Sequence, residues 1–274
     1  WCFSLSQASP LYLSFQMLYT ILQYFTGKNN SFPMFFSWEV LPIYIWLLHA
    51  LETEFCLVRR MKESPRGSVD LLRHKASGQR FVLRRFRGNA EVYRKLLAYS
   101  CPNLPATLEV ASQGEENLVL EEYIQGDTMD FLLRENLFSV RETRSLITQV
   151  CQALWVLHTM GAVHRDVKPE NIMLRGSQAV LIDFDAARLY KPEGEADTQI
   201  LGTTGFAAPE QYGLSQTDQR ADLYAVGVLI NIMLTGKHPS QQLVPGRLGR
   251  IVERCTQVNP EKRYPNILRL MEAL

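Results

Sequence analysis

The chain has 274 residues, of which 46% are hydrophobic and 21% charged, and its formal net charge is +1. This balance is typical of a globular protein that buries a core in one large domain or two small ones. It excludes strong attraction to nucleic acid, so no nucleic-acid partner is expected. The 5 cysteines are scattered without a CxxC pair, which favours buried, reduced thiols over a disulfide framework or a zinc site.

Residues 1–51 differ in composition from the rest of the chain, because Lys28 and Glu39 are their only ionised side chains. They hold two apolar stretches, at 11–25 and 32–51. The first is short and broken by polar residues, whereas the second has about the ~20 residues that a membrane span requires. Residues 1–51 are therefore expected to form an apolar extension ahead of the main domain.

Three interpretations of this extension remain open. Residues 32–51 could anchor the chain in a membrane, and the basic cluster at 59–62 would then keep the downstream domain in the cytoplasm. A glutamate, a proline and a histidine inside the stretch oppose a span. The second interpretation is a non-native segment, since the chain begins at Trp1, and the third is a helical extension packed on the main domain. The pattern of a signal peptide is missing.

Residues 54–124 are predicted to form a small, mostly antiparallel sheet with one helix. Alternating apolar residues between turn-forming residues indicate the strands, and a proline at 102 marks the end of the helix region. The expected strands are 55–58, 69–72, 81–86, 106–111 and 117–123, and the expected helix is 90–99.

From Asp127 onward the apolar residues recur at three- and four-residue spacing, which predicts a helical region. Two short strands interrupt it, at 172–174 and 179–182. The expected helices are 129–133, 140–160, 218–235, 248–257 and 267–274.

One polar run stands out in this region. Residues 164–171 read His-Arg-Asp-Val-Lys-Pro-Glu-Asn, and Asp183 follows within Leu-Ile-Asp-Phe-Asp. Phosphoryl transfer requires a carboxylate that orients a hydroxyl, a cation near the moving phosphate, and oxygen ligands for magnesium. The run supplies all three, so it indicates phosphoryl-transfer chemistry.

These residues resemble the catalytic loop of eukaryotic-type protein kinases, and the segment Ala-Ala-Pro-Glu-Gln-Tyr-Gly at 207–213 looks like bacterial members of that family. The resemblance covers residues 54–274. It implies an α+β, bilobal fold over 52–274, with a small β-rich N-lobe at about 52–124 and a larger helical C-lobe at about 125–274.

The resemblance also implies roles for single residues. Asp166 would be the catalytic base, and Lys168 would neutralise charge on the transferred phosphoryl group. Asn171 and Asp183 would bind the metal. The expected cofactors are ATP and Mg2+.

The segment from Asp183 to Glu210 matches the family's activation and substrate-binding segment. Arg165 either pairs with a phosphate on this segment, for which Thr198 is the candidate, or with a local carboxylate. Thr203 is expected to position substrate near the base.

Three further residues match structural positions of the family. Glu210, in Ala-Pro-Glu, is expected to form a buried ion pair with Arg263. Asp222 is expected to support the catalytic loop from the start of a helix.

The expected nucleotide-binding residues depart from the family's pattern. The phosphate-covering loop keeps one glycine, Gly67, with Val69 at the adenine-packing position. Arg84 stands where the family has a lysine, and Glu91 is its expected partner on the following helix; a surface arginine is the alternative.

Four more positions complete the predicted site. Glu121 falls at the back of the adenine pocket, followed by Glu122 and Ile124 at the expected nucleotide-contacting segment. Asp185 replaces the glycine that usually follows Asp-Phe, which adds a carboxylate near the metal.

The expected function is ATP- and Mg2+-dependent phosphorylation of Ser/Thr hydroxyls in protein substrates by a cytoplasmic kinase domain. The alternative is a pseudokinase that binds nucleotide or a protein partner without efficient transfer, favoured by Arg84 and the weakened glycine loop. A small-molecule kinase is a third interpretation, disfavoured by Glu210 and Arg263, whose motifs serve protein-substrate docking. The sequence leaves the oligomeric state open.

Overall fold

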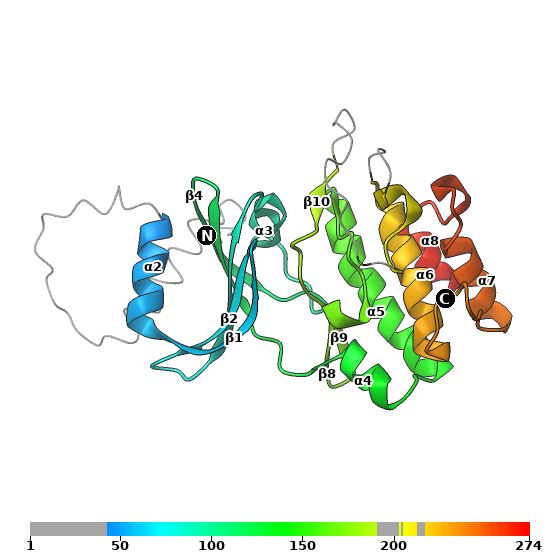
Figure 1. The fold of residues 1–274 in the computed structure, drawn as a ribbon, viewed down its shortest axis with the longest axis horizontal. Coiled ribbons are helices and arrows are strands. Elements are labelled where there is room, and N and C mark those ends of the chain that lie inside the picture. The colour runs from blue at the N-terminus through cyan, green and yellow to red at the C-terminus, as the bar shows by residue number, and fades with distance from the viewer. Residues whose placement is uncertain (1–42, 191–202, 204, 213–216) are drawn as a thin grey trace, which may run out of the picture. The chain divides into compact units, whose positions relative to one another are not determined.

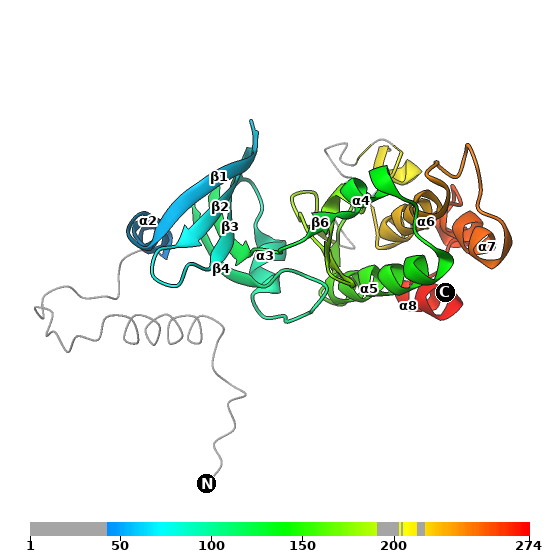
Figure 2. The same cartoon turned by 90° about the horizontal axis from the view of Figure 1, so that it is seen from below.

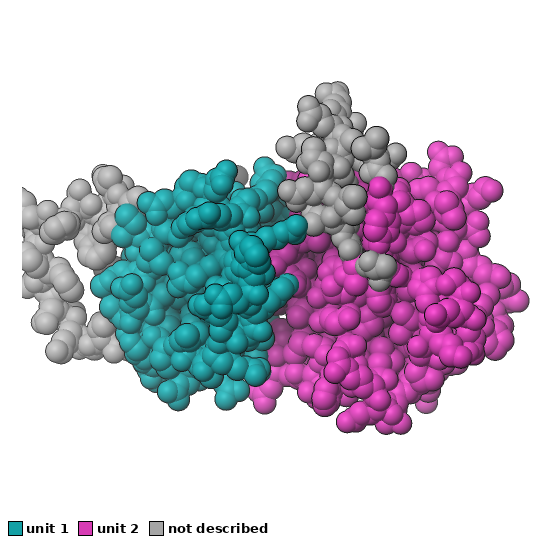
Figure 3. Space-filling view, in the orientation of Figure 1, with its two compact units in different colours: residues 1–98, 106–123 teal, residues 99–105, 124–274 magenta. Residues whose placement is uncertain are grey.

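The computed structural model describes residues 43–190, 203, 205–212 and 217–274. These residues form two compact units, coloured teal and magenta in Figure 3. The described part of unit 1 comprises 43–98 and 106–123, and unit 2 comprises 99–105 and the described residues from 124 onward. A β-rich first unit and a helical second unit confirm the predicted α+β, bilobal class.

Unit 1 is built on a five-stranded sheet in the order β1-β2-β3-β5-β4, with every neighbouring pair antiparallel. All five predicted strands are present; β1 to β4 are longer than predicted because the pairing continues toward the turns, and β5 has the predicted length. The strands are β1 Phe55–Ser64, β2 Gly67–His74, β3 Arg80–Arg87, β4 Thr107–Gln113 and β5 Glu116–Glu122. Helix α3, Glu91–Leu96, is shorter than the predicted 90–99.

Close packing of β2 against β3 explains why residue 67, just after the turn between β1 and β2, is a glycine. A Cβ atom on Gly67 would lie 1.9 Å from the backbone oxygen of Arg85 on β3. Only glycine permits such an approach, so this residue is required by the sheet itself. Strand β1 reaches Ser64, so the predicted turn at 63–68 narrows to Pro65 and Arg66.

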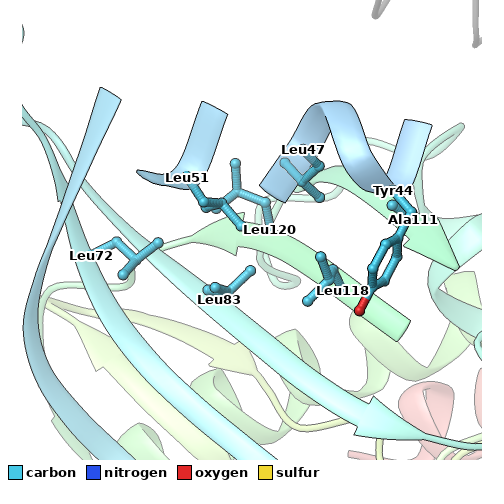
Figure 4. Packing of buried hydrophobic residues seen from close by; sticks show 8 residues of the cluster. All are labelled: Tyr44, Leu47, Leu51, Leu72, Leu83, Ala111, Leu118 and Leu120. Atoms are coloured by element: carbon cyan, nitrogen blue, oxygen red, sulfur yellow. The ribbon is translucent and has the colours of Figure 1, made fainter. Parts of the chain in front are cut away.

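Helix α2, Ile43–Glu54, fits the third interpretation of the extension, a helix packed on the main domain, over residues 43–51. It covers one face of the sheet, and α3 lies on the other face (Figure 1 and Figure 2). Figure 4 shows its apolar side chains directed at leucines of the strands. The buried cluster consists of Tyr44, Leu47, Leu51, Leu72, Leu83, Ala111, Leu118 and Leu120. Each buried leucine contributes roughly 1.5–3 kcal/mol, so α2 is part of the unit's core.

This packing bears on the predicted extension. Residues 43–51, the second half of the candidate span 32–51, lie in α2, which crosses the predicted boundary at residue 51. Residues 32–42 lie outside the described residues. Among the residues that the structure describes, no helix has the length and apolar character needed to cross a bilayer.

Unit 2 contains all five predicted helices. They are α4 Met129–Glu135, α5 Val140–Thr159, α6 Arg220–Thr235, α7 Gly246–Cys255 and α8 Ile267–Ala273. Helix α5 begins at a capping box, in which Ser139 and Glu142 each bind the other's backbone N–H. Helix α6 ends at Gly236, whose φ of 70° is the left-handed conformation of a C-terminal cap.

Short strands position the polar loops of unit 2. Strands β8 Ile172–Arg175 and β9 Gln178–Leu181 were predicted and pair with each other, and β8 also pairs with β6 Asp127–Thr128. Strands β7 Ala162–Val163 and β10 Arg188–Leu189 pair with each other and were not predicted, because two residues give no readable period. The predicted catalytic loop lies between β7 and β8, and Asp183 follows β9.

Residues 99–105 pack with unit 2 although their neighbours in sequence belong to unit 1. Asn103 is buried, its side chain donates to the carbonyl of Ala179 at 2.8 Å, and its own carbonyl accepts from Leu181 N–H at 2.9 Å. The Gln178 side chain donates to the carbonyl of Pro102. This segment therefore fixes β9, the strand that leads to Asp183.

The cysteines agree with the expected free thiols. Cys56, Cys101, Cys151 and Cys255 are free, and the last two are buried. Burial raises the pKa of the Cys255 thiol to about 12, so this group stays protonated and acts as a small apolar side chain. Cys2 lies outside the described residues.

Candidate active site

Asp222, at the start of α6, anchors the predicted catalytic loop. Its carboxylate accepts from the backbone N–H groups of His164 at 2.9 Å and Arg165 at 2.8 Å, and contacts His158 Nε2 at 2.8 Å. Burial would raise the pKa of Asp222, but the hydrogen bond and charge of His158 and the interactions with His164 outweigh it and hold the pKa below 3.8. The predicted supporting role is confirmed, and His158 is a partner that the sequence did not indicate.

Two residues of the site have backbone conformations that non-glycine residues rarely adopt. Arg165 has a φ of 69° and Asp183 a φ of 68°. Left-handed residues of this kind cost on the order of 1 kcal/mol each and persist where surrounding contacts enforce them. At Arg165 the enforcing contact is the bond from its own N–H to Asp222.

Asp166, Lys168 and Thr203 form a closed cluster. The Thr203 hydroxyl donates to Asp166 Oδ1 at 2.7 Å and accepts from Lys168 Nζ at 2.6 Å. Lys168 Nζ also lies 2.8 Å from Asp166 Oδ2. Both charged side chains are mostly buried, at 17% and 18% exposure, so their attraction is stronger than at an open surface. The predicted base, the predicted cation and the predicted substrate-positioning threonine are thus in direct contact.

Asn171 fixes the other side of Asp166. Its Nδ2 donates to the backbone oxygen of Asp166 at 2.8 Å and to Oδ2 at 2.9 Å. The backbone oxygen of Asn171 accepts from Ile182 N–H at 2.8 Å, which joins the loop to the residue before Asp183. Since Nδ2 makes both donated bonds, Oδ1 is the Asn171 atom suited to a cation.

Asp183 lies beside a buried histidine. His164 Nε2 is 3.3 Å from the backbone oxygen of Ile182, and its ring meets Phe184 edge-on at 5.5 Å. Burial lowers the pKa of His164, which keeps the ring neutral near pH 7, although the carboxylates of Asp222, Asp166 and Asp183 act in the opposite direction.

Asp185, the residue in place of glycine, is exposed, and its N–H donates to Asp183 Oδ1 at 3.4 Å. Its φ is not among the positive values, so the aspartate is tolerated without the conformation that only glycine adopts readily.

Asn171 and Asp183 are chemically suited to a hard divalent cation, since both offer oxygen ligands. Among the described residues, no three His, Cys, Asp or Glu side chains converge as a complete metal site. Magnesium is commonly held by one or two protein oxygens together with substrate phosphates and water. The donor set therefore fits a metal that arrives with a nucleotide.

The ion pair expected from Ala-Pro-Glu is confirmed. Arg263 donates to both oxygens of Glu210, at 2.6 and 2.8 Å, and to the backbone oxygens of Gln257, Val258 and Arg220. Five hydrogen bonds donated by this fully buried guanidinium satisfy its charge and polarity together.

Gln211 is a connecting residue that the sequence analysis missed. Its Oε1 accepts from Ala208 N–H and its Nε2 donates to the backbone oxygen of Arg165, both at 2.9 Å. It thus joins the Ala-Pro-Glu segment to the catalytic loop. In the sequence, the available signal for this role was a glutamine directly after Ala-Pro-Glu. Thr198, the candidate phosphorylation site, lies outside the described residues.

Unit 1 holds the residues predicted to bind nucleotide, except Ile124. Arg84 on β3 is buried, and its Nε lies 2.6 Å from Glu121 Oε2 on β5. The expected partner Glu91 is hydrogen-bonded to Asn89 instead. The interpretation of Arg84 as a surface arginine is wrong, because the side chain is 8% exposed. Val69 pairs directly with Arg84 across the strands and faces the same side of the sheet.

The remaining predicted contacts lie where unit 1 ends at Tyr123 and unit 2 resumes at Ile124. Glu122 closes β5, and its carboxylate accepts from the backbone N–H of Ala106 at 3.2 Å. Ile124 is buried and begins the second part of unit 2. An acid in the apolar run of β5 was the sequence signal that Glu121 has a buried cationic partner.

Comparison with known proteins identifies the family. Residues 86–268 match the family model described as protein kinase domain, and the chain therefore belongs to the protein kinase domain family. The matched range begins after Gly67 and Arg84, where the predicted nucleotide-binding pattern departs most from the family.

Three bacterial proteins are among the relatives of this chain. It is 30% identical over 186 residues to serine/threonine-protein kinase pkn2 of Myxococcus xanthus, covering 65% of this chain and 22% of that protein. It is 31% identical over 223 residues to a probable serine/threonine-protein kinase of Clostridium perfringens, covering 72% and 32%. It is 31% identical over 184 residues to PknB of Mycolicibacterium smegmatis, covering 63% and 29%. The matched part is thus a third or less of each of these relatives.

Proposed function

We propose that this protein is a serine/threonine protein kinase that transfers the γ-phosphoryl group of ATP to hydroxyls of protein substrates. The observation that carries the proposal is the cluster of Asp166, Lys168 and Thr203. There the Thr203 hydroxyl donates a hydrogen bond to a carboxylate oxygen of Asp166, and the hydroxyl oxygen accepts one from the ammonium group of Lys168. This is the arrangement that an attacking hydroxyl requires.

The residues of unit 2 would act as follows. Asp166 orients the substrate hydroxyl and accepts its proton, and its carboxylate is fixed for this task by Asn171. Lys168 neutralises negative charge on the transferred group. Asn171 Oδ1 and Asp183 would hold Mg2+, which when bound neutralises phosphate charge and orients the nucleotide. Thr203 keeps the base and the lysine in register for substrate.

The test is transfer of labelled phosphate from Mg-ATP to a generic Ser/Thr protein substrate by the full chain. Asp166→Asn should lower kcat by about 100-fold or more, since general-base catalysis contributes roughly 10²–10⁴. Asp130→Asn is the matched control, because it makes the same acid-to-amide change at the α4 surface, where Asp130 pairs with Arg134. Its kcat should stay within about twofold of the unchanged chain.

Equal transfer by the unchanged chain and Asp166→Asn would rule out the assigned base. A serine-to-tyrosine comparison in the same substrate tests the hydroxyl class, and preference for tyrosine would contradict the Ser/Thr assignment. Activity with manganese or calcium in place of magnesium tests the metal.

A second candidate function rests on one observation in unit 1. Arg84 is engaged by Glu121, which favours a pseudokinase that binds nucleotide or a protein partner without efficient transfer. This alternative predicts saturable nucleotide binding together with equal, background-level transfer by the unchanged chain and Asp166→Asn. The same assay, run beside a nucleotide-binding titration, separates the two functions.

A further inference from the structure

A cavity of about 330 Å³ lies in unit 1, on the face of the sheet that α2 covers. Residues 63–68, which include Gly67 of the predicted phosphate-covering loop, line it, but Arg85 alternates with Arg84 along β3, so Arg85 and Arg84 lie on opposite faces of the sheet. Tyr44 of α2 lines one side, and Figure 4 shows its hydroxyl at the edge of the leucine cluster. We call it the arginine cavity, after the described residues Arg60, Arg66, Arg85 and Arg87 that line it.

The arginine cavity has an excess of positive charge. Its charged lining is four arginines against two glutamates, Glu63 and Glu116. Arg60 pairs with Glu63 at 3.0 Å and with Asp70 at 2.9 Å, and Arg87 pairs with Glu116 at 3.1 Å. Within the described residues, Arg66 and Arg85 have no carboxylate within ion-pair distance. Arg85 is half-buried, so its charge is poorly screened by water and favours an anion.

Hydroxyl groups add neutral donors to the same cavity. Ser68 on β2 lies directly opposite Arg85 on β3, and Arg85 lies opposite Leu118 of the α2-facing core. Opposite residues of an antiparallel pair share a face, with Cβ atoms about 4.5–5.5 Å apart. Burial and the Glu116 carboxylate raise the pKa of Tyr44, and its protonated hydroxyl donates to Glu116 Oε2 at 3.4 Å.

We propose that the arginine cavity is a binding site for a phosphoryl group, held by Arg85 and Arg66. A forked guanidinium matches phosphate oxygens with two parallel hydrogen bonds, and a dianion would offset the excess charge. The cavity volume admits a phosphate with accompanying water.

The phosphoryl group has two sources with the same chemistry. It is either a free phosphate-bearing anion or a phosphate carried on Ser68. In the second case the Ser68 Oγ–phosphorus bond forms as the γ-phosphorus–oxygen bond of a nucleoside triphosphate breaks, leaving the diphosphate, and the hydroxyl proton passes to a base. Both sources place negative charge against Arg85, so one substitution tests both.

The first arm titrates inorganic phosphate into the full chain by calorimetry. Arg85→Gln should weaken binding about tenfold or more, because it removes charge-assisted hydrogen bonds. Arg141→Gln is the control, since it removes the same charge from an exposed position at the start of α5, and should change Kd less than about twofold. Arg85→Lys keeps the charge, and its retained binding would show that the site tolerates substitution.

The second arm compares thermal unfolding of the full chain with and without phosphoserine installed at position 68. If the group is carried on Ser68, phosphoserine raises the midpoint in the unchanged chain and lowers it in Arg85→Gln. If phosphate binding depends on Arg85 and phosphoserine does not raise the midpoint, the site binds a free anion. The proposal is overturned if phosphate binding is absent or equally sensitive to Arg141→Gln, and phosphoserine fails to raise the midpoint.

Discussion

The two units treat their buried charges differently. In unit 2, Asp222 is met by two backbone N–H groups and a histidine, and Arg263 by a carboxylate and three backbone oxygens. In unit 1, the buried charge of Arg84 faces Glu121, a side chain on a neighbouring strand. Backbone partners cannot be changed by substitution, whereas a side-chain partner can. The loop chemistry is therefore fixed by the fold, and the predicted nucleotide-binding side depends on a particular pair of residues.

The largest expected effect is in unit 2. Asp222→Ala leaves two buried N–H donors and His158 without their acceptor, and should destabilise the protein by about 3–5 kcal/mol and abolish transfer. Urea denaturation measures the loss. Asp130→Ala, at the surface pair with Arg134, should cost less than about 1 kcal/mol. Equal costs for the two variants would contradict the anchoring role of Asp222.

The pH dependence of this variant has a definite sign. The pKa of Asp222 in the folded protein is below its ordinary value of 3.8, so the carboxylate stabilises the fold fully above that pH. That contribution is lost as the pH falls through the lower folded value. The stability gap between the unchanged chain and Asp222→Ala should therefore narrow in strong acid, and a gap that widens there would contradict the assignment.

The second prediction concerns the pair in unit 1. Arg84→Met or Glu121→Leu alone leaves the other charge buried and should cost about 3–5 kcal/mol. The double substitution should be neutral within about 1 kcal/mol or stabilising, because it removes both desolvated charges. Urea unfolding of the unchanged chain, the two single variants and the double variant gives the coupling free energy between Arg84 and Glu121. Additive losses in the double variant would show that the two residues act independently.

The third prediction tests the helix that covers unit 1. Leu47, on the sheet-facing side of α2, is 2% exposed, so Leu47→Ala should lower the free energy of unfolding by about 3 kcal/mol by leaving a cavity. Ile45, on the same helix, is 41% exposed, and Ile45→Ala should cost less than about 1 kcal/mol. Thermal unfolding compares them, and equal shifts would mean that α2 does not belong to the core.

The smallest expected effect is a gain in stability when Glu109 of β4 is replaced by glutamine. Burial raises the pKa of this carboxyl above 4.5, outweighing the hydrogen bond from Val110 N–H. The protonated form therefore stabilises the fold below pH 4.5, and this contribution is lost as the pH rises through the folded value. Glu109→Gln cannot ionise, so its melting temperature should exceed that of the unchanged chain increasingly from pH 4.5 to pH 8. A difference independent of pH would contradict this.

The sequence predicted most of the fold because long periodic segments carry a readable pattern. The strands 81–86 and 117–123 and the helices 140–160 and 218–235 appear within a few residues of their expected bounds. A packed helix was one of three interpretations left open for the extension, because its apolar residues equally fit a membrane segment, and only the leucines on the facing strands distinguish the two. Long-range packing of that kind leaves no local pattern.

The site residues likewise divide into those that a local sequence pattern predicts and those that depend on long-range packing. Residues 164–171 were recognised because they stand close together in sequence, and the structure brings Asp166, Lys168 and Thr203 into contact. The partner of Arg84 was predicted on a helix by resemblance and lies on β5, because the acid at Glu121 offers a closer buried carboxylate. A pairing across separate strands depends on register, which a single sequence does not specify.

The placement of residues 99–105 has a consequence for how this fold can be divided. The chain crosses from one unit to the other at 98, 105 and 123, so the units are interleaved in sequence. A fragment starting at Ile124 would lack Asn103, and β9 would lose its bonds to that residue's side chain and backbone just ahead of Asp183. Shuffling the units as continuous halves would thus separate the segment that carries Asp183 from a supporting residue about eighty positions upstream, whereas exchanges that carry 99–105 with the second half would keep the two together.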